Sequence, residues 1–198
     1  MTACVECVAL LVPARPDRLP GLAAVDPAPA QAGGVALRPV TAADAEAVSR
    51  IYAHHVEHSV ATFDLEAPDP DGWLARSADI TSAGWPFLVA VDDGAVVGFA
   101  YVSAWRPRPA YRHTVEDSIY LAPGSSGRGI GRALLGEVLD RAARAGAEQA
   151  VAVIADSGDP ASAALHRALG FSEAGRLRRV GRKHGRVLDV VLMQASLA

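Results

Sequence analysis

The stretch that decides the fold is Ser126–Arg132, which reads SGRGIGR. Its three alternating glycines stand between a segment with strand character and a segment with helical spacing of apolar residues. Glycines let successive backbone N–H groups converge on one point, and the start of a helix adds partial positive charge there. Arg128 and Arg132 place full positive charges beside that point. The stretch therefore predicts a site for a pyrophosphate group.

Two other interpretations of this stretch stay open. A Rossmann dinucleotide site requires G-x-G-x-x-G after the first strand and an acidic residue about 20 positions later. Here the spacing is G-x-G-x-G after the fourth predicted strand, and Asp140 falls inside the following helix. The second alternative is a glycine-rich turn without a ligand, although two arginines beside three glycines exceed what a turn requires.

The patterns on either side of the stretch predict an α/β fold, an α+β mixed sheet with helices on both faces. The apolar segment 149–155 predicts a central strand covered on both faces, and Asp92-Asp93-Gly94 predicts a hairpin. The expected order is β-α-α-β-β-β-α-β-α-β-β. The strands are expected at 35–40, 87–91, 95–104, 114–121, 149–155, 173–180 and 186–194, and the helices at 41–56, 70–82, 132–145 and 160–169.

The first 34 residues differ in composition from the rest of the chain. Residues 13–34 hold five of the 13 prolines and end in Gly33-Gly34, which predicts a flexible Pro/Ala-rich linker. We expect residues 1–34 to be an N-terminal extension and residues 35–198 to form one domain. Cys4 and Cys7 could form a redox pair or half of a zinc site, but no second cysteine pair completes four ligands.

Overall composition excludes several classes of protein. The chain has 198 residues, of which 51% are hydrophobic and 21% charged, with a formal net charge of −3. Such a chain is globular, and it has no general electrostatic attraction to nucleic acid or anionic membranes. No apolar run approaches the length of a transmembrane helix, and residues 4–12 lack the basic flank of a secretory signal. We therefore expect a cytoplasmic protein.

The chain resembles the GCN5-related N-acetyltransferase (GNAT) superfamily, whose Q/R-x-x-G-x-G/A segment cradles the pyrophosphate of acetyl-CoA. The resemblance covers about residues 35–196 and narrows to the phosphinothricin / methionine sulfoximine acetyltransferase branch. It implies the GNAT acyl-CoA N-acyltransferase fold, with a mixed, mostly antiparallel central sheet. The resemblance to this branch rests on the following segments: Ile51-Tyr52, Thr62-Phe63, 110–116 (AYRHTVE), 119–121 (IYL), 165–171 (LHRALGF), Lys183-His184-Gly185 and 188–194 (LDVVLMQ).

The resemblance implies acetyl-CoA as the acetyl donor. Backbone groups of residues 119–121, on a strand that separates from its neighbour, would pair with the pantetheine amides, and the N–H near Leu121 would polarise the thioester oxygen. Two positions depart from the pattern: Ser126 stands for the usual Gln or Arg, and Asp159 for an Asn. An ionised Asp can only accept, which weakens cofactor binding or shifts the contact to Ser162. The expected cofactor-binding residues are Ile119, Tyr120, Leu121, Gly127, Arg128, Gly129, Ile130, Gly131, Arg132, Asp159 and Ser162.

Glu116 is the candidate general base. It lies in a predicted strand with apolar Val115 and Ile119 nearby and a basic loop before it. A carboxylate there can take the proton that an amine must lose, directly or through water. The resemblance implies the same role, because the family's T-V-E glutamate falls at this position. The alternative is a charge at a strand edge that pairs with Arg112.

His166 is the second candidate catalytic residue. It lies four residues before Gly170 on a helix that is otherwise apolar at Ala163, Leu165 and Leu169. Many members of the superfamily place here a tyrosine that protonates the departing thiolate, and an imidazole can do so at neutral pH. The alternative is a histidine that packs in the core, bonds a backbone carbonyl, or positions the cofactor.

The loop 106–112 (RPRPAYR) is the candidate acceptor site, because arginines suit a carboxylate or phosphinate and Tyr111 adds an aromatic face. A solvated basic loop is the alternative. Phe63 and Trp105 could line the apolar part of the pocket. The family's Lys-His-Gly hairpin is expected near the active site and a dimer contact. The expected substrate-binding residues are Phe63, Arg106, Ala110, Tyr111, Arg112 and Lys183.

We expect an acetyl-CoA-dependent N-acetyltransferase that acts on the α-amine of a small amino-acid-like acid: phosphinothricin, methionine sulfoximine or methionine sulfone. Such an activity confers antibiotic or herbicide resistance, and the resemblance implies a homodimer. The alternatives are another small amine or a protein N-terminus as acceptor, or a non-catalytic acetyl-CoA-binding module.

No metal is expected, because no carboxylate or cysteine completes a metal site with His54 and His58. The basic run 176–186 lacks the interleaved aromatics of a nucleic-acid site.

Overall fold

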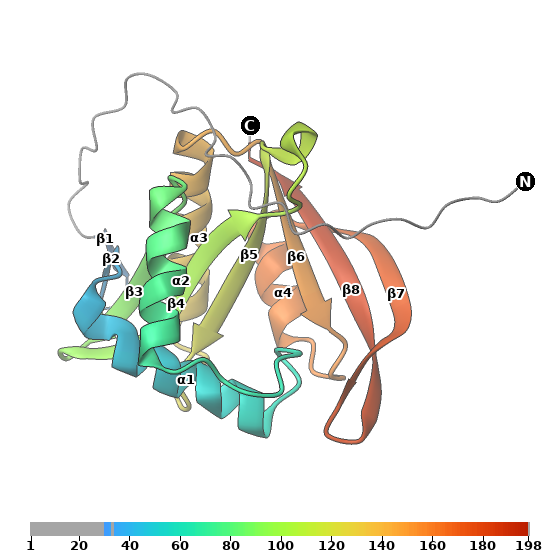
Figure 1. Cartoon of the computed structure of the whole chain (residues 1–198), viewed down its shortest axis with the longest axis horizontal. Helices are drawn as coiled ribbons and strands as arrows, with labels where there is room; N and C mark the ends of the chain where they lie inside the picture. Colours follow the sequence, from blue (N-terminus) through green and yellow to red (C-terminus); the bar gives the residue numbers. More distant parts are fainter. Residues whose placement is uncertain (1–29, 33, 198) are drawn as a thin grey trace, which may run out of the picture.

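The computed structural model describes residues 30–32 and 34–197, so the two cysteines lie outside the described residues. Eight strands form one sheet in the order β1-β2-β3-β4-β5-β6-β8-β7 (Figure 1). The elements are β1 (Ala30–Ala32), β2 (Val35–Pro39), the 3-10 turn η1 (Ala42–Asp44), α1 (Ala45–His58), α2 (Pro70–Ser82), β3 (Phe87–Asp92), β4 (Ala95–Ala104), the 3-10 turn η2 (Pro109–Tyr111), β5 (Thr114–Leu121), α3 (Ile130–Arg144), β6 (Gln149–Ala155), α4 (Ala161–Ala168), β7 (Ser172–Lys183) and β8 (Arg186–Ser196).

The predicted α/β order is confirmed, with one addition at the N-terminal side. Ala30–Ala32 lie in the segment interpreted as a linker, yet they pair antiparallel with Val35–Leu37 at the edge of the sheet. Regular structure therefore begins a few residues before Val35. The division into an extension and a domain stays a prediction, because residues 1–29 are outside the described residues.

The sheet has a hydrophobic core on each face, and each core is covered by a different pair of helices. On one face, α1 and α2 bury an aromatic group against β3 and β4, including Tyr52, Trp73, Phe87 and Phe99. On the other, α3 buries an aliphatic stripe that includes Leu134, and α4 packs beside it. Figure 1 shows the two pairs of helices on opposite faces. This is the expected mixed sheet with helices on both faces.

Local capping explains where the first helices begin. Asp69 accepts a hydrogen bond from the Gly72 N–H, and Pro70 occupies the first turn of α2, where its missing N–H costs nothing. The Asp44 carboxylate accepts hydrogen bonds from the Arg38 guanidinium and from Thr41 before α1. The Arg38 hydrogen bond, above all, lowers the pKa of Asp44 to about 2. None of the described helices has the length and hydrophobicity needed to cross a membrane.

The sheet divides between β5 and β6, the one parallel pair of neighbouring strands that the described residues form. The two strands pair only over residues 114–116 and 149–151. Beyond that point β5 stays with β4 up to Leu121, β6 stays with β8 up to Ala155, and a gap opens between them (Figure 1). The expectation that β6 is covered on both faces is therefore wrong for its second half, where the Val153 side chain is exposed.

Candidate active site

A cavity of about 720 Å³ lies at this division of the sheet. Residues 116–121 of β5 line one side, and residues 152–155 of β6 line the other. The glycine-rich turn, the start of α4 and the loop after α1 complete the wall. The cavity thus joins the predicted pyrophosphate turn to the predicted base. Glu116 lies five residues before Leu121, the end of β5, which corresponds to about 17 Å of extended strand.

The glycine-rich turn forms an open hollow at one end of the cavity. Gly127 and Gly129 have φ near +78°, and a Cβ built on either one would meet no atom within 4 Å. These left-handed conformations suit glycine, and the vacant space lies where a side chain would otherwise project. Gly129 precedes α3, whose first turn has no side-chain cap. Uncapped N–H groups at a helix start favour an anion, so the hollow fits a pyrophosphate.

The two expected arginines of this turn separate in the structure. Arg132 lines the cavity, whereas the Arg128 guanidinium pairs with Asp92 at 2.7 Å and does not line it. The Ile130 side chain is buried in the aliphatic core, so only its backbone can face a ligand. Positive charge from a side chain beside the hollow therefore comes from Arg132.

The splayed end of β5 offers backbone groups to the cavity. The Ala122 N–H donates to the Val97 carbonyl of β4 at 2.9 Å, and hydrogen bonding alternates along an antiparallel pair. The backbone groups of Ile119 and Leu121 therefore face away from β4, toward the gap. Those of Tyr120 face β4, and its ring packs in the aromatic core. Of the three expected cofactor residues on β5, Ile119 and Leu121 are placed to pair with an added strand.

His55 on α1 fixes the end of this strand. Its Nε2–H donates to the Leu121 carbonyl at 2.9 Å, and the imidazole lines the cavity. Burial lowers the pKa of His55, which favours the neutral ring. The Leu121 carbonyl thus already has a donor, which leaves its N–H as the group directed into the gap.

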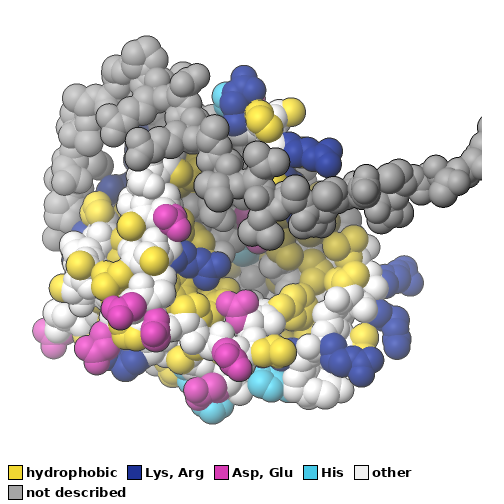
Figure 2. All heavy atoms as spheres, in the orientation of Figure 1, with side chains coloured by type: hydrophobic (Ala, Val, Ile, Leu, Met, Phe, Trp, Pro, Cys, Tyr) yellow, Lys and Arg dark blue, Asp and Glu magenta, His cyan; other side chains and the backbone are white. Residues whose placement is uncertain are grey.

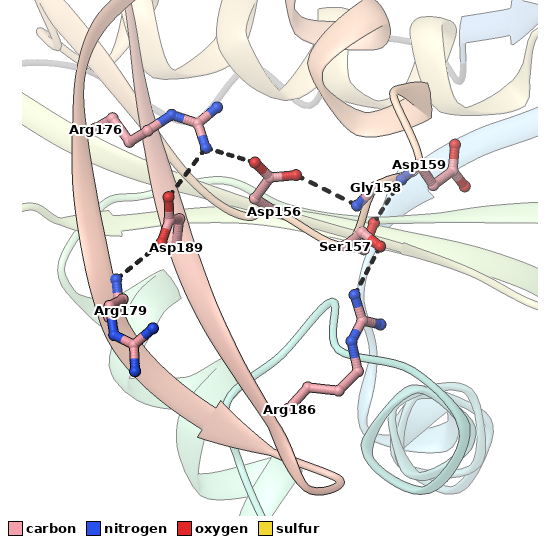
Figure 3. A network of polar contacts seen from close by, with 8 residues as sticks. All are labelled: Asp156, Ser157, Gly158, Asp159, Arg176, Arg179, Arg186 and Asp189. Carbon is pink, nitrogen blue, oxygen red and sulfur yellow. Dashed lines mark hydrogen bonds and ion pairs between the residues drawn. The ribbon is translucent and has the colours of Figure 1, made fainter.

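Asp159 and Ser162 both line the cavity near the start of α4. The Asp159 carboxylate accepts a hydrogen bond from the Ala161 N–H at 2.9 Å, so it stabilises the helix start. The loop before it is held by the β7–β8 hairpin: Arg186 donates to the Ser157 carbonyl, and Arg176 pairs with Asp156 and Asp189 (Figure 3). The hairpin therefore positions one wall of the cavity.

Glu116 lies at the closed end of the cavity, on the last β5 residue that pairs with β6. Burial raises the pKa of its carboxyl, the charge of Asp117 adds to the rise, and Arg106 opposes it. Within the described residues no cation lies within 4 Å of the Glu116 carboxylate, so the alternative of a pair with Arg112 is not realised. A half-buried carboxylate without a partner, with a raised pKa and facing a cavity, can accept a proton from an amine.

Both ring nitrogens of His166 are occupied by protein groups. Nδ1–H donates to the Ser162 carbonyl at 2.7 Å, and Nε2 lies 2.9 Å from the Asp117 carboxylate. The His166 and Asp117 side chains are 3% and 2% exposed. Burial alone would lower the pKa of His166, but the hydrogen bond and charge of Asp117 outweigh it and raise the pKa. This geometry favours a positioning role, because neither nitrogen is free to donate a proton to a thiolate.

The expected substrate residues do not form one cluster. Phe63 lines the main cavity, while Arg106 and Tyr111 line a separate hollow of about 230 Å³. Ala110 and Arg112 are exposed and line neither of these two cavities. Lys183 is buried, and its ammonium donates to the Thr62 carbonyl at 2.8 Å, so it ties β7 to the loop after α1.

Several residues of the site went unnoticed in the sequence. Tyr52 donates to Asp64 at 2.6 Å and contacts the Thr62 hydroxyl, and burial raises its pKa to about 12. Asp117 could have been noticed as an acidic residue within an apolar strand, next to Glu116. Tyr52 lies in a segment that carried the family resemblance, but it was not predicted as a site residue. Other lining side chains had no local signal, since they converge from distant segments; they include His55, Asp64, Arg76, Tyr101 and Ser118.

Comparison with known proteins gives one family. Residues 48–171 match the Acetyltransferase (GNAT) family. The chain is 47% identical over 154 residues to a phosphinothricin N-acetyltransferase of Alcaligenes faecalis, covering 78% of each protein. It is 39% identical over 155 residues to an L-methionine sulfoximine/L-methionine sulfone acetyltransferase of Salmonella typhimurium, covering 78% of this chain and 90% of the relative.

A solved structure has the same fold. The GNAT phosphinothricin acetyltransferase of Sinorhizobium meliloti, in complex with acetyl-CoA, superposes with a TM-score of 0.80. The two proteins are 46% identical, and the match covers 83% of this chain and 89% of that one. That structure contains acetyl-CoA, a molecule whose pyrophosphate group matches the anion that the glycine hollow of this chain would bind.

Proposed function

The chain belongs to the acetyltransferase (GNAT) family, and from that premise we propose that it transfers an acetyl group to the α-amine of a small amino-acid-like acid. The acceptors that we propose are phosphinothricin, methionine sulfoximine and methionine sulfone, because relatives at 39–47% identity bear the names of these activities. Acetyl-CoA supplies the activated acetyl group as a thioester. No metal takes part in this proposal.

The donor would be held by three parts of the cavity. The hollow of Gly127, Gly129 and Gly131, with Arg132 beside it, would take the pyrophosphate. Backbone groups of Ile119 and Leu121 would pair with the pantetheine arm. Asp159 and Ser162 would border that arm from α4, in a loop that the β7–β8 hairpin holds in place.

Glu116 would accept the proton of the attacking amine. Burial raises its pKa, which makes it a stronger base than an exposed glutamate. The cavity would hold the two reactants together, which lowers the barrier independently of proton transfer. In this proposal His166 positions α4 through Asp117 and does not itself supply a proton.

The observation that carries the proposal is the position of Glu116: its carboxylate, unpaired among the described residues, lies where β5 and β6 part, in a cavity whose other end is the glycine hollow. We expect Glu116→Gln to lower the rate of thiol release with methionine sulfone by about 10²- to 10⁴-fold, the range of general base catalysis. The affinity for acetyl-CoA, measured by calorimetry, should stay unchanged because the hollow is untouched.

The pH profile separates a base from a structural residue. The wild-type rate should rise with pH through the pKa of Glu116, and Glu116→Gln should flatten that limb. Glu173→Gln, which alters an exposed carboxylate on β7, is the matched control and should leave rate and profile unchanged. A Glu116→Gln enzyme with near wild-type turnover and an unchanged profile would show that another group removes the proton.

We further propose a homodimer that works in the cytoplasm, where acetyl-CoA is available, and that confers resistance by acetylating such acids. The β7–β8 end of the sheet supports the dimer, because the exposed apolar side chains of Leu177, Val180 and Val187 lie there. Figure 2 shows dark blue basic side chains gathered over this end, whereas acidic ones gather over α1 and α2. Light scattering at micromolar concentration tests the oligomeric state.

A further inference from the structure

The main cavity is lined by two arginines, and we propose that Arg76 on α2 binds the α-carboxylate of the acceptor. This inference rests on the proposed function and names the residue that selects an acidic acceptor. Arg76 lies in none of the segments by which the sequence resembled its family. Its position at the cavity follows from the fold alone.

Two aromatic rings hold the Arg76 guanidinium in place. Its central carbon lies 5.3 Å from the centroid of the Trp73 ring and 5.8 Å from that of the Tyr101 ring, both of which are buried. Cation–π contacts of this kind orient a guanidinium over a ring while its N–H groups stay accessible. The Arg76 side chain therefore rests on two buried rings at the wall of the cavity.

The other cations near the site are placed for different work. Arg132 belongs to the glycine hollow at the far end of the cavity. The ammonium of Lys183 is buried on the Thr62 carbonyl. Arg106 and Arg108 line a separate hollow. Within the described chain, this leaves Arg76 as the arginine that lines the main cavity away from the pyrophosphate end.

The charges of the cavity make such a cation necessary for an acidic acceptor. Glu116 and Asp64 both line the cavity and would repel a carboxylate, whereas His166 offsets the charge of Asp117. In the part of the chain that the structure describes, no carboxylate lies within ion-pair distance of Arg76. Its charge is thus available to an incoming anion.

Tyr101 places Arg76 and Glu116 around the same point. Tyr101 of β4 lies opposite Ser118 and Glu116 lies opposite Ser103, so Tyr101 and Glu116 are diagonal neighbours on the same face of the sheet. The Arg76 guanidinium lies 5.8 Å from the centroid of the same Tyr101 ring. In an α-amino acid the amine and the carboxylate share a carbon atom, so an acceptor whose amine faces Glu116 has its carboxylate close by, within the same cavity that Arg76 lines. A bidentate pair would also fix the direction in which the amine points.

The test compares methionine sulfone with its carboxamide, which keeps the amine and the sulfone and removes the negative charge. For each enzyme the quantity is the ratio of kcat/KM for the acid to kcat/KM for the amide. We expect Arg76→Gln to lower this ratio by about 10- to 100-fold, the value of a hydrogen bond to a charged group, through KM for the acid. Arg76→Lys should lower it less, because it keeps the charge and loses the fork.

The ratio is independent of the fraction of folded enzyme, so a loss of packing on Trp73 cannot imitate the expected result. The lower basicity of the carboxamide's amine affects every variant alike. Arg50→Gln, which alters an exposed arginine of α1 paired with Glu46, is the matched control and should keep the wild-type ratio.

Three outcomes overturn the assignment. An unchanged ratio in Arg76→Gln shows that this guanidinium does not bind the carboxylate, and a fall in Arg106→Gln instead assigns that role to the basic loop. If the wild-type enzyme acetylates the amide as well as the acid, the proposed acetyl transfer stands, but the proposed selectivity for an acidic acceptor is wrong. A wild-type enzyme that acetylates neither compound contradicts the proposed acceptor class together with this assignment.

Discussion

Removing the carboxylate of Asp117 should destabilise the fold by an amount that the structure allows us to work out. Asp117 and His166 form an ion pair at 2.9 Å with side chains 2% and 3% exposed, and the second ring nitrogen of His166 is held by the Ser162 carbonyl. Breaking a buried pair by removing one partner costs about 3–5 kcal/mol. For a chain of this size each kcal/mol lowers Tm by about 2–4 °C, so Asp117→Ala should melt about 6–20 °C below the wild type near pH 6.

The stability that the Asp117–His166 pair contributes should decrease as the pH rises. Asp117 raises the pKa of His166 in the folded chain above its ordinary value of 6.5. Stability from the pair is therefore fully present below pH about 6.5 and is lost as the pH rises through the raised pKa. In Asp117→Asn the carboxylate is gone, and burial, which is the largest cause, outweighs the remaining hydrogen bond to Ser162 and lowers the pKa of His166. The stability of that variant should then increase with pH over the same range.

Urea unfolding of wild type and Asp117→Asn, followed by tryptophan fluorescence between about pH 5.5 and 8.5, measures both slopes. The other histidines contribute equally to the two proteins and cancel in the difference. That difference in unfolding free energy should be largest at low pH and shrink as pH rises. A difference that is constant with pH, or an Asp117→Ala protein that melts within about 2 °C of wild type, would refute the argument that a charged pair holds α4 to β5.

Two further predictions concern the glycine hollow and the N-terminal segment. Gly129→Val should weaken acetyl-CoA binding by at least tenfold, since its side chain would enter the open hollow and strain a φ of +78° at a cost of about 1–2 kcal/mol; calorimetry on a folded variant with unchanged affinity would remove the site. A chain that begins at Ala30 should keep the Tm and turnover of the whole protein, because the two cores, as far as the structure describes the chain, consist of residues within 35–197; a drop of more than a few degrees would assign residues 1–29 a structural role.

Most of the fold could be predicted from local sequence. The predicted bounds of α2, β4, β5 and β6 agree with the structure, because periodicity of apolar residues and stop signals such as Gly84 act within one element. The hairpin at residues 92–94 and the mixed order of the sheet were predictable for the same reason. The short strand β1 was not, since its three residues have no pattern of their own and depend on the edge of β2.

Part of the site was also local. The glycine-rich turn has its backbone conformation because glycine permits positive φ, and Glu116 faces the cavity because of its place in β5. Lys183 and Arg128 looked equally suitable for ligands in the sequence. Their charges are instead taken by the Thr62 carbonyl, 121 residues away, and by Asp92.

The sequence by itself determined most of the elements, the conformation of the glycine-rich turn and the position of the candidate base, since each depends on neighbours a few positions apart. Only the tertiary structure decided where β5 and β6 separate, that His166 pairs with Asp117 across 49 residues, and that Arg76 reaches the cavity. Strand divergence depends on which partner each strand follows after its last shared hydrogen bond. Whether a charged side chain is paired within the protein or available to a ligand likewise depends on the groups that folding brings to it from distant parts of the chain.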